Sequence, residues 1–315
     1  MKQNAAVVFV IVVTLVRMAC ASAAIPVPAK AAGYTDLTFS STFRPSEVDV
    51  TKEGTPGHQW YLWSFFGKNA NGSELKFNKN GTLTLEGGPT GPNGEIATAA
   101  KMRGAGNFIG TAFGGGAYFE ATLAFRPQDI VNADYQGHPA FWAMALEHLV
   151  GYGQNKGSKA KRFEHFVEVD IFEYDMLGYT GMENVYGGAL HDWYGIWHET
   201  CVTGLCSITN ASLKKRVPPA TDFERFHTYG LLWKPATTIS PGYAQFYFDE
   251  RPVGGIVLWN QCVPGSHPGD HGYSPFCVLD RQHLVLILGT GRGEPMTVRS
   301  VRVYQASPLD NIVKQ

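Results

Sequence analysis

The stretch HFVEVDIFEYD, residues 165–175, places four carboxylates among valine, isoleucine and phenylalanine. Side chains of a strand alternate between its two faces, so Glu168 and Asp170 lie opposite the apolar residues beside them. The alternation slips at Ile171 and Phe172, which are both apolar, and a β-bulge supplies one extra residue of this kind. A bulge here returns Glu173 to the face of Glu168 and Asp170. The sequence therefore predicts a row of three acids that face a cleft.

Three acids on one face indicate chemistry by a pair of carboxylates. Glu168 and Glu173 are expected about 13 Å apart along the backbone, and two glutamates that lean together can reach the ~5–5.5 Å of a retaining glycosidase. Crowding by Asp170 would raise the pKa of a neighbour and help to keep one glutamate protonated. The alternatives are a metal site and a solvated charged strand. Calcium would accept these carboxylates, but the glycine and carbonyl pattern of its usual loop is absent.

The elements that must hold these acids are mostly strands. Segments 82–86, 119–125 and 244–248 alternate apolar and polar residues, whereas 284–288 is apolar throughout, as in a strand covered on both faces. Amphipathic helices are scarce, and 36 glycines and 18 prolines supply turns. These patterns predict an all-β fold, a two-sheet β-sandwich in one domain.

The N-terminus has the features of a secretory signal peptide. Lys2 precedes an apolar run over 5–16, and small residues follow, with an Ala-x-Ala-like cleavage region near 21–24. The run is too short for a hydrocarbon core, which needs about 20 residues. We expect a signal peptide over 1–23, a short spacer over 24–33 and one catalytic domain over 34–308. The mature protein is expected to be secreted and not membrane-bound.

Cysteine usage agrees with export. Removal of the signal peptide leaves four cysteines, and an even count in an exported chain indicates two disulfides among Cys201, Cys206, Cys262 and Cys277. Local pairing, 201–206 and 262–277, is the simplest of three connectivities. A zinc site is disfavoured because no C-x-x-C spacing is present. The formal net charge of −1 supplies no global field for nucleic acid. We expect no metal, no cofactor and no nucleic-acid partner.

In the order and spacing of its motifs the chain resembles glycoside hydrolase family 16, the laminarinase-like β-glucanases and their relatives. The E-x-D-x-x-E of Glu168, Asp170 and Glu173 resembles the bulged active-site motif of that family. Further stretches fit in the same order over nearly all of the mature chain: HPAFWAM (138–144), FHTYGLLW (226–233), FYFDE (246–250) and VRVYQ (301–305). The resemblance implies a jelly roll with an open substrate groove. It implies Glu168 as the nucleophile, Glu173 as the acid/base and Asp170 as the residue that orients and tunes the nucleophile.

Other residues are candidates for substrate binding. Trp142 would stack on a sugar ring, because aromatic faces suit the apolar faces of pyranosides, or would be a core tryptophan. The family pattern suggests His191 beside the acid/base glutamate on the next strand; a hydrogen-bonded structural histidine is the alternative. Trp193 and Trp197 are candidate groove aromatics. Glu120 is a candidate buried residue of the groove, without a catalytic role.

The paired glutamates predict a retaining endo-glycosidase that cleaves a β-linked polysaccharide by double displacement, and a monomer is expected. The family resemblance implies a β-1,3- or mixed-linkage β-glucan as substrate. One alternative is a hydrolase of an algal galactan of the agar or carrageenan type, which the basic loop KGSKAKR (156–162) favours. A non-catalytic carbohydrate-binding protein on the same fold is the other, and the two glutamates argue against it. Transglycosylation is disfavoured, because the resemblance associates it with an unbulged E-x-D-x-E.

Overall fold

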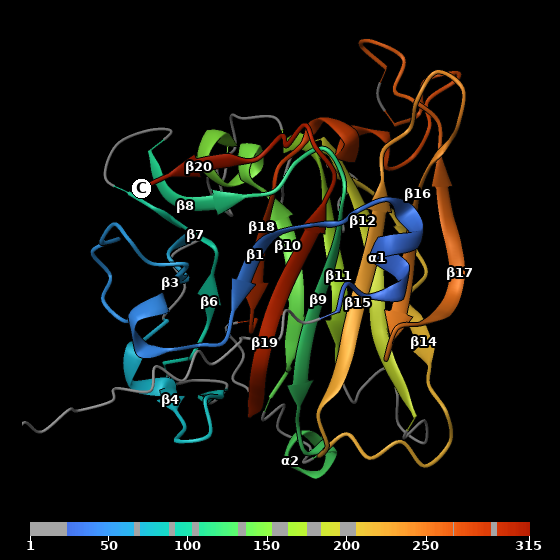
Figure 1. The fold of residues 1–315 in the computed structure, drawn as a ribbon. Coiled ribbons are helices and arrows are strands. Elements are labelled where there is room, and N and C mark those ends of the chain that lie inside the picture. The colour runs from blue at the N-terminus through green and yellow to red at the C-terminus, as the bar shows by residue number, and fades with distance from the viewer. Residues whose placement is uncertain are drawn as a thin grey trace, which may run out of the picture.

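The structure, a computed structural model, describes residues 24–65, 70–87, 92–102, 107–131, 137–152, 163–174, 184–195, 206–266, 268–290 and 295–315. Two large, mainly antiparallel sheets make up most of this part of the chain, and Figure 1 shows their long strands side by side. The predicted all-β sandwich is therefore confirmed. The expected signal peptide, the basic loop 156–162 and Trp197 lie outside the described residues.

One sheet has eight strands among these residues, in the order β17-β16-β15-β9-β19-β5-β4, with β1 also paired to β19. Its strands are β1 (Asp36–Ser41), β4 (Leu75–Phe77), β5 (Leu83–Leu85), β9 (Ala117–Ala124), β15 (His227–Lys234), β16 (Gly242–Phe248), β17 (Arg251–Trp259) and β19 (Met296–Gln305).

The second sheet has nine strands within the described ranges, in the order β13-β12-β11-β10-β18-β6-β3-β2, with β14 also paired to β12. They are β2 (Val48–Asp49), β3 (Trp60–Leu62), β6 (Ile96–Ala97), β10 (Ala140–Ala145), β11 (Phe163–Glu173), β12 (Val185–Gly195), β13 (Cys206–Ala211), β14 (Lys214–Arg216) and β18 (Leu284–Leu288). The acidic stretch occupies β11, in the middle of this sheet.

A small third sheet joins β7 (Ala99–Lys101), β8 (Phe108–Ala112) and β20 (Ile312–Lys314). The helices are short: α1 (Val27–Ala32), α2 (Pro127–Val131), a π-helical turn over His148–Tyr152, and 3-10 turns over Pro45–Glu47, Gly72–Glu74 and Cys277–Arg281. None of the helices in the described ranges is long and apolar enough to cross a membrane.

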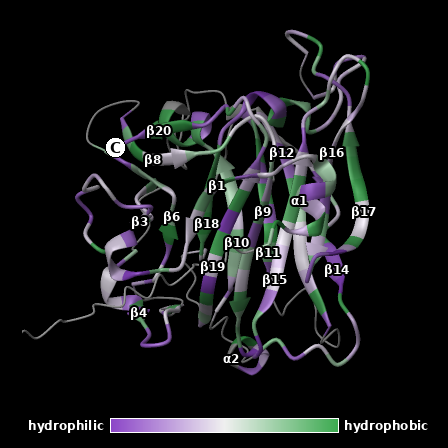
Figure 2. Cartoon of the chain, in the orientation of Figure 1, coloured by the Kyte–Doolittle hydropathy of each residue, from purple (hydrophilic) through white to green (hydrophobic). Residues whose placement is uncertain are grey.

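The core lies between the two large sheets and follows the alternation read from the sequence. On β11, Val167 and Val169 are fully buried, and the ring of Phe172 lies 4.3 Å from that of Tyr229 on β15 of the opposite sheet. Every residue of β18 is buried, as its unbroken apolar run predicts. Figure 2 shows the hydrophobic residues gathered along β10 and β18. Full burial of such a side chain contributes roughly 1.5–3 kcal/mol, so the two sheets are held together mainly by these rows.

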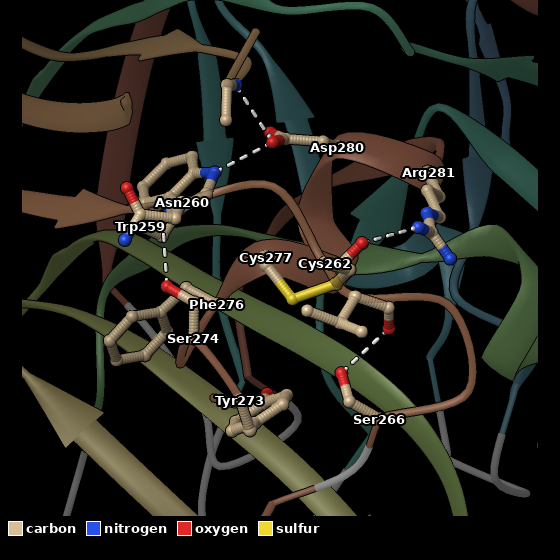
Figure 3. The surroundings of a disulfide bond; sticks show 12 residues. Trp259, Asn260, Cys262, Ser266, Tyr273, Ser274, Phe276, Cys277, Asp280 and Arg281 are labelled. Atoms are coloured by element: carbon tan, nitrogen blue, oxygen red, sulfur yellow. Dashed lines mark hydrogen bonds between the residues drawn. A yellow bond between two sulfur atoms is a disulfide. The ribbon is translucent and has the colours of Figure 1, made fainter. Parts of the chain in front are cut away.

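The structure describes the segment expected as a spacer and one of the two expected disulfides. Residues 24–33, expected as a spacer, include α1, whose Pro28 and Ala29 are buried and which contacts β9 and β15. The Cys262–Cys277 disulfide expected from local pairing is present, and Figure 3 shows its surroundings. The second pairing is not described, because Cys201 lies outside the described residues, although Cys206 begins β13.

Candidate active site

The predicted bulge is present in β11. Along β10, Phe141 pairs with Phe172 and the next residue, Trp142, pairs with Asp170, so the partner strand skips one residue. The ladder between β11 and β12 also shifts between Asp170 and Glu173. The register with β10 skips Ile171, which is fully buried, and the register with β12 leaves Ile171 and Phe172 opposite one residue. The extra residue restores Glu173 to the face of the other two acids.

Register across β10, β11 and β12 places a set of polar and aromatic side chains on that face. Residues directly opposite each other on antiparallel strands point to the same side of a sheet. Glu168 pairs with His191, and Asp170 pairs with Trp142. Here the term acid face denotes the side chains of Glu168, Asp170, Glu173, His191, Trp193 and Trp142.

Glu168 is held by an indole. Trp193 Nε1 donates a hydrogen bond of 2.8 Å to Glu168 Oε2. Trp193 lies two residues beyond His191 on β12, so strand alternation brings both side chains to the acid face. Indole nitrogen is a donor only, which favours the ionised carboxylate at Glu168. The arrangement suits a carboxylate that must attack while charged.

Asp170 is held by a histidine. Its Oδ2 lies 2.8 Å from His191 Nε2, and His191 Nδ1 forms a short hydrogen bond to Asn210 Oδ1 on β13. Both ring nitrogens thus face oxygen atoms that accept hydrogen bonds. Only a protonated imidazole donates from both nitrogens, so the geometry favours His191 as a cation paired with Asp170.

The charge balance of the row follows from burial and these partners. Burial raises the pKa of Glu168 and the charge of Glu173 adds to the rise, while His191 and the Trp193 N–H oppose it. Burial, with the charges of Glu173 and Glu168, raises the pKa of Asp170 well above its usual range, against the pull of His191. Burial alone would lower the pKa of His191, but its bond to Asp170 outweighs this and raises the pKa to about 9.

As the sequence predicts, a neighbouring negative charge raises the pKa of one glutamate, but that charge is not the one on Asp170. The charge that raises the pKa of Glu168 belongs to Glu173, and Asp170 is paired with His191 instead. At neutral pH the pair of Asp170 and His191 keeps a proton, because each raised pKa favours its retention. A row of three acids thus carries less negative charge than its composition indicates.

His191 does not lie where the family pattern placed it. It is the register partner of Glu168 and contacts Asp170, whereas Glu173 lies opposite Gly187, four residues away along β12. The histidine beside Glu173 is His138, whose Nε2 lies 3.3 Å from Glu173 Oε1. Sequence reasoning missed His138 because it belongs to a loop before β10, where no strand alternation assigns a face.

Trp142 lies on the acid face and is half-buried. Its Nε1 donates a hydrogen bond of 2.6 Å to the carbonyl of Gly289, and its ring centroid lies 5.9 Å from that of Trp63. Ring contact on one side and a satisfied indole N–H fix the orientation of this side chain. It is neither a fully buried core residue nor a freely exposed platform.

A buried polar network lies under β12 on the opposite side from the acid face. Asp192, which is almost fully buried, accepts hydrogen bonds from the Phe276 N–H at 2.8 Å and from the Tyr273 hydroxyl, and it contacts His165 Nε2 at 2.7 Å. Tyr273 and Phe276 belong to the loop closed by the Cys262–Cys277 disulfide (Figure 3). Asp192 lies between His191 and Trp193 in the sequence of β12. The network that holds Asp192 therefore also fixes the part of the strand that carries these two residues.

Glu120 is not part of the acid face, contrary to the expectation of a groove residue. It lies on β9 of the eight-stranded sheet, opposite Arg302 on β19, and its Oε1 lies 2.5 Å from an Arg302 nitrogen. Burial raises the pKa of Glu120 to about 7, although the Arg302 charge opposes the rise. The alternation of apolar and polar residues predicts that Glu120 is buried. It does not predict the sheet to which Glu120 belongs, because that depends on the order of the strands.

Within the described ranges, no group of three or more histidine, cysteine, aspartate or glutamate side chains is arranged to hold a metal ion. The acid face is built from carboxylate, imidazole and indole side chains. It offers one carboxylate held by an N–H donor, one carboxyl group beside a histidine, and an aspartate–histidine pair between them.

No protein-family model matches the chain, and no curated protein matches it in sequence. Among solved structures, an endo-1,3-β-glucanase from Streptomyces sioyaensis aligns with a TM-score of 0.50 and 17% identity, over 88% of this chain and 96% of that one. This chain has the fold of that glucanase. The predicted resemblance to glycoside hydrolase family 16 is thus confirmed at the level of the fold.

Two more distant alignments were also found. A glycoside hydrolase family 16 endo-glucanase from Bacteroides ovatus aligns with a TM-score of 0.41 and 16% identity, over 84% of this chain and 93% of that one. The Emp46p carbohydrate recognition domain aligns with a TM-score of 0.36 and 12% identity, over 79% and 89% of the two chains. Alignments this distant carry no weight for function.

Proposed function

We propose that the protein is a retaining endo-glycosidase that hydrolyses a β-linked glucan. The observation that carries the proposal is the bulged strand β11, which sets Glu168, Asp170 and Glu173 close enough for their charges to interact. The same strand belongs to a sandwich that shares its fold with an endo-1,3-β-glucanase. The expected export of the chain suits a polysaccharide substrate, which lies outside cells.

The first step would use Glu173 as the acid and Glu168 as the nucleophile. Glu173 gives its proton to the glycosidic oxygen while the Glu168 carboxylate attacks the anomeric carbon. The glycosidic C–O bond breaks and an ester bond to Glu168 forms. The Trp193 N–H holds the attacking carboxylate in place, since it binds one of its two oxygens. The other oxygen is then available for attack.

The second step would reverse these roles at Glu173. Glu173, now ionised, takes a proton from water, and the water oxygen attacks the anomeric carbon and releases Glu168. Two inversions restore the β configuration. Asp170, which shares a proton with His191, would tune the nucleophile without placing a third full negative charge beside it.

Trp142 and Trp193 are proposed to contact the sugar. Both indoles lie on the acid face, on strands to either side of β11, and both are half-buried. Aromatic rings fixed in this way present flat surfaces to the apolar faces of pyranosides. Their N–H groups are already used, so we expect stacking and not hydrogen bonding from them.

A panel of polysaccharides tests the proposal. Purified protein is incubated with laminarin, lichenan, agarose and carrageenan, and the products are sized; E168Q serves as the inactive control for trace contaminating glucanase. A ladder of oligosaccharides from laminarin, absent with E168Q, is the expected result. Cleavage of a galactan with laminarin untouched would contradict the choice of a β-glucan. Binding to a glycan without cleavage of any would contradict the assignment as an enzyme.

A further inference from the structure

The segment before β10 brings a third partner to the row of acids. Ala140 is the register partner of Glu173, and His138 lies two residues earlier, next to Pro139. His138 Nε2 lies 3.3 Å from Glu173 Oε1, and the side chains are 14% and 29% exposed, respectively. No other ion-pair contact is seen for Glu173 among the described residues. His138 is therefore the titratable side chain seen against the Glu173 carboxyl group in the described ranges.

The backbone that follows His138 is held from both neighbouring strands, by residues at the ends of β11 and β18. The Tyr174 N–H donates to the Pro139 carbonyl at 3.0 Å, and the Gly289 N–H donates to the Ala140 carbonyl at 2.9 Å. Proline restricts the residue before it to an extended conformation, which limits the positions that the imidazole can take. A side chain anchored in this way can hold a neighbouring group to the geometry that catalysis requires.

The Nε2 atom of His138 has an unmet hydrogen-bonding capacity. It is buried, and it makes no aligned hydrogen bond within the part of the chain that the structure describes. A buried polar nitrogen without a partner is costly, by about 1–3 kcal/mol. The Glu173 carboxyl group, with Oε1 3.3 Å from this nitrogen, is a hydrogen-bonding group that can relieve this cost.

Each acid of the row then has one partner of its own. Trp193 serves Glu168 and His191 serves Asp170, both from β12. Glu173 has His138, which approaches from the opposite side, that of β10. The three partners differ in kind, which suits the three different tasks of a nucleophile, its tuning residue and an acid/base.

We propose that His138 is a positioning residue for Glu173, aligning its carboxyl group so that the proton on the other oxygen points at the glycosidic oxygen. The inference rests on the proposed function, because it takes Glu173 as the acid/base. In the first step the proton moves from Glu173 to the leaving oxygen as the glycosidic bond breaks and the bond to Glu168 forms. His138 gives up no proton in this step; it holds Oε1.

Leaving-group dependence tests the proposal. Dinitrophenolate leaves without protonation, so the hydrolysis of 2,4-dinitrophenyl β-laminaribioside does not need a general acid in its first step, whereas laminarin does. The parameter kcat/KM reports that first step for both substrates. In H138A, kcat/KM for laminarin should fall by about 10- to 100-fold, since misplacement by about 1 Å can cost a factor of 100. The dinitrophenyl substrate should lose less than about threefold, on the same reasoning.

Two further variants sharpen the result. H138Q keeps a nitrogen at a position similar to Nε2 and should recover part of the loss on laminarin. H283A is the matched control, because His283 contacts Glu147 at 2.6 Å from another loop beside β10, away from the acid face. Its ratio of the two kcat/KM values should equal that of the wild type. This ratio does not depend on the fraction of folded protein, so partial misfolding of H138A leaves the test valid.

Equal losses on both substrates in H138A, or no loss on either, would overturn the role of His138 while the proposed function stands. A wild-type protein that cleaves neither substrate would overturn the proposed function, and the inference with it. The two failures are therefore distinct. Selective loss on laminarin with partial recovery in H138Q supports the inference.

Discussion

Replacing Trp193 by phenylalanine should shift the pH dependence of hydrolysis in a defined direction. The variant keeps an aromatic ring on the acid face and removes the N–H that lies 2.8 Å from Glu168 Oε2. A hydrogen bond to a charged group contributes about 1.5–3 kcal/mol, and about 1.36 kcal/mol corresponds to one pKa unit. Loss of this bond disfavours the ionised carboxylate, so the pKa of Glu168 should rise by about 1–2 units.

The nucleophile must be ionised to attack, so the acid limb of kcat/KM against pH should move upward by the same amount. Below the wild-type limb the loss is expected to be about 10- to 100-fold, and it should shrink as the pH rises past the new limb. Reducing-sugar release from laminarin, measured from pH 3.5 to 8, gives the profile. This shift and this loss are expected only if Glu168 is the nucleophile. If Glu168 took no part in the reaction, a change in its pKa would not move the acid limb.

W142F is the matched control. Trp142 lies on the same face, but its Nε1 donates to the carbonyl of Gly289, which does not titrate. Loss of this hydrogen bond in W142F should lower kcat/KM without moving the acid limb. A W193F profile that falls uniformly at every pH, or an equal shift of the limb in W142F, would refute the reasoning that ties Trp193 to the charge of Glu168.

Three further predictions follow from the acid face and the opposite sheet. Hydrolysis should retain the anomeric configuration, so proton NMR of a laminarin digest should show the β-anomer first, and an initial α-anomer would contradict double displacement. The His191 pKa of about 9 against 6.5 adds stability that is complete below pH 6.5 and lost as the pH rises through 9. H191Q should therefore lose less stability than the wild type over that range, by up to about 3 kcal/mol in urea unfolding, and equal losses would contradict it. The Glu120 pKa of about 7 against 4.5 gives stability that is lost as the pH rises from 4.5 through 7. E120Q should lack this slope, also up to about 3 kcal/mol, and an unchanged slope would exclude Glu120 as its source.

Strand alternation predicts the acid face well because its cause is local. The slip at Ile171 and Phe172 is visible in the sequence, and the register of both neighbouring strands shifts at that point. The alternating apolar rows on β9 and β16 are buried as well, but on β9 the residues between them are mostly buried too, which alternation does not predict. The fold class follows from many such strands with few helices between them.

Residues that depend on strand order or on loops were not accessible in the same way. Glu120 has the pattern of a buried strand residue, but it belongs to the sheet opposite β11. His191 faces Asp170 and not Glu173, because the register of β12 against β11 sets which pairs meet, and the sequence does not show that register. His138 reaches Glu173 from a loop, where the side-chain direction depends on tertiary contacts.

Azide rescue tests the central claim, the roles of Glu168 and Glu173, most directly. Folded E168A and E173A are assayed on 2,4-dinitrophenyl β-laminaribioside with sodium azide, and the anomer of the glycosyl azide is read by proton NMR. Azide replaces the missing nucleophile in E168A by one inversion and should give the α-azide, whereas in E173A it should attack the ester on Glu168 and give the β-azide. Exchanged anomers, or wild-type turnover of laminarin by either folded variant, would contradict the assignment.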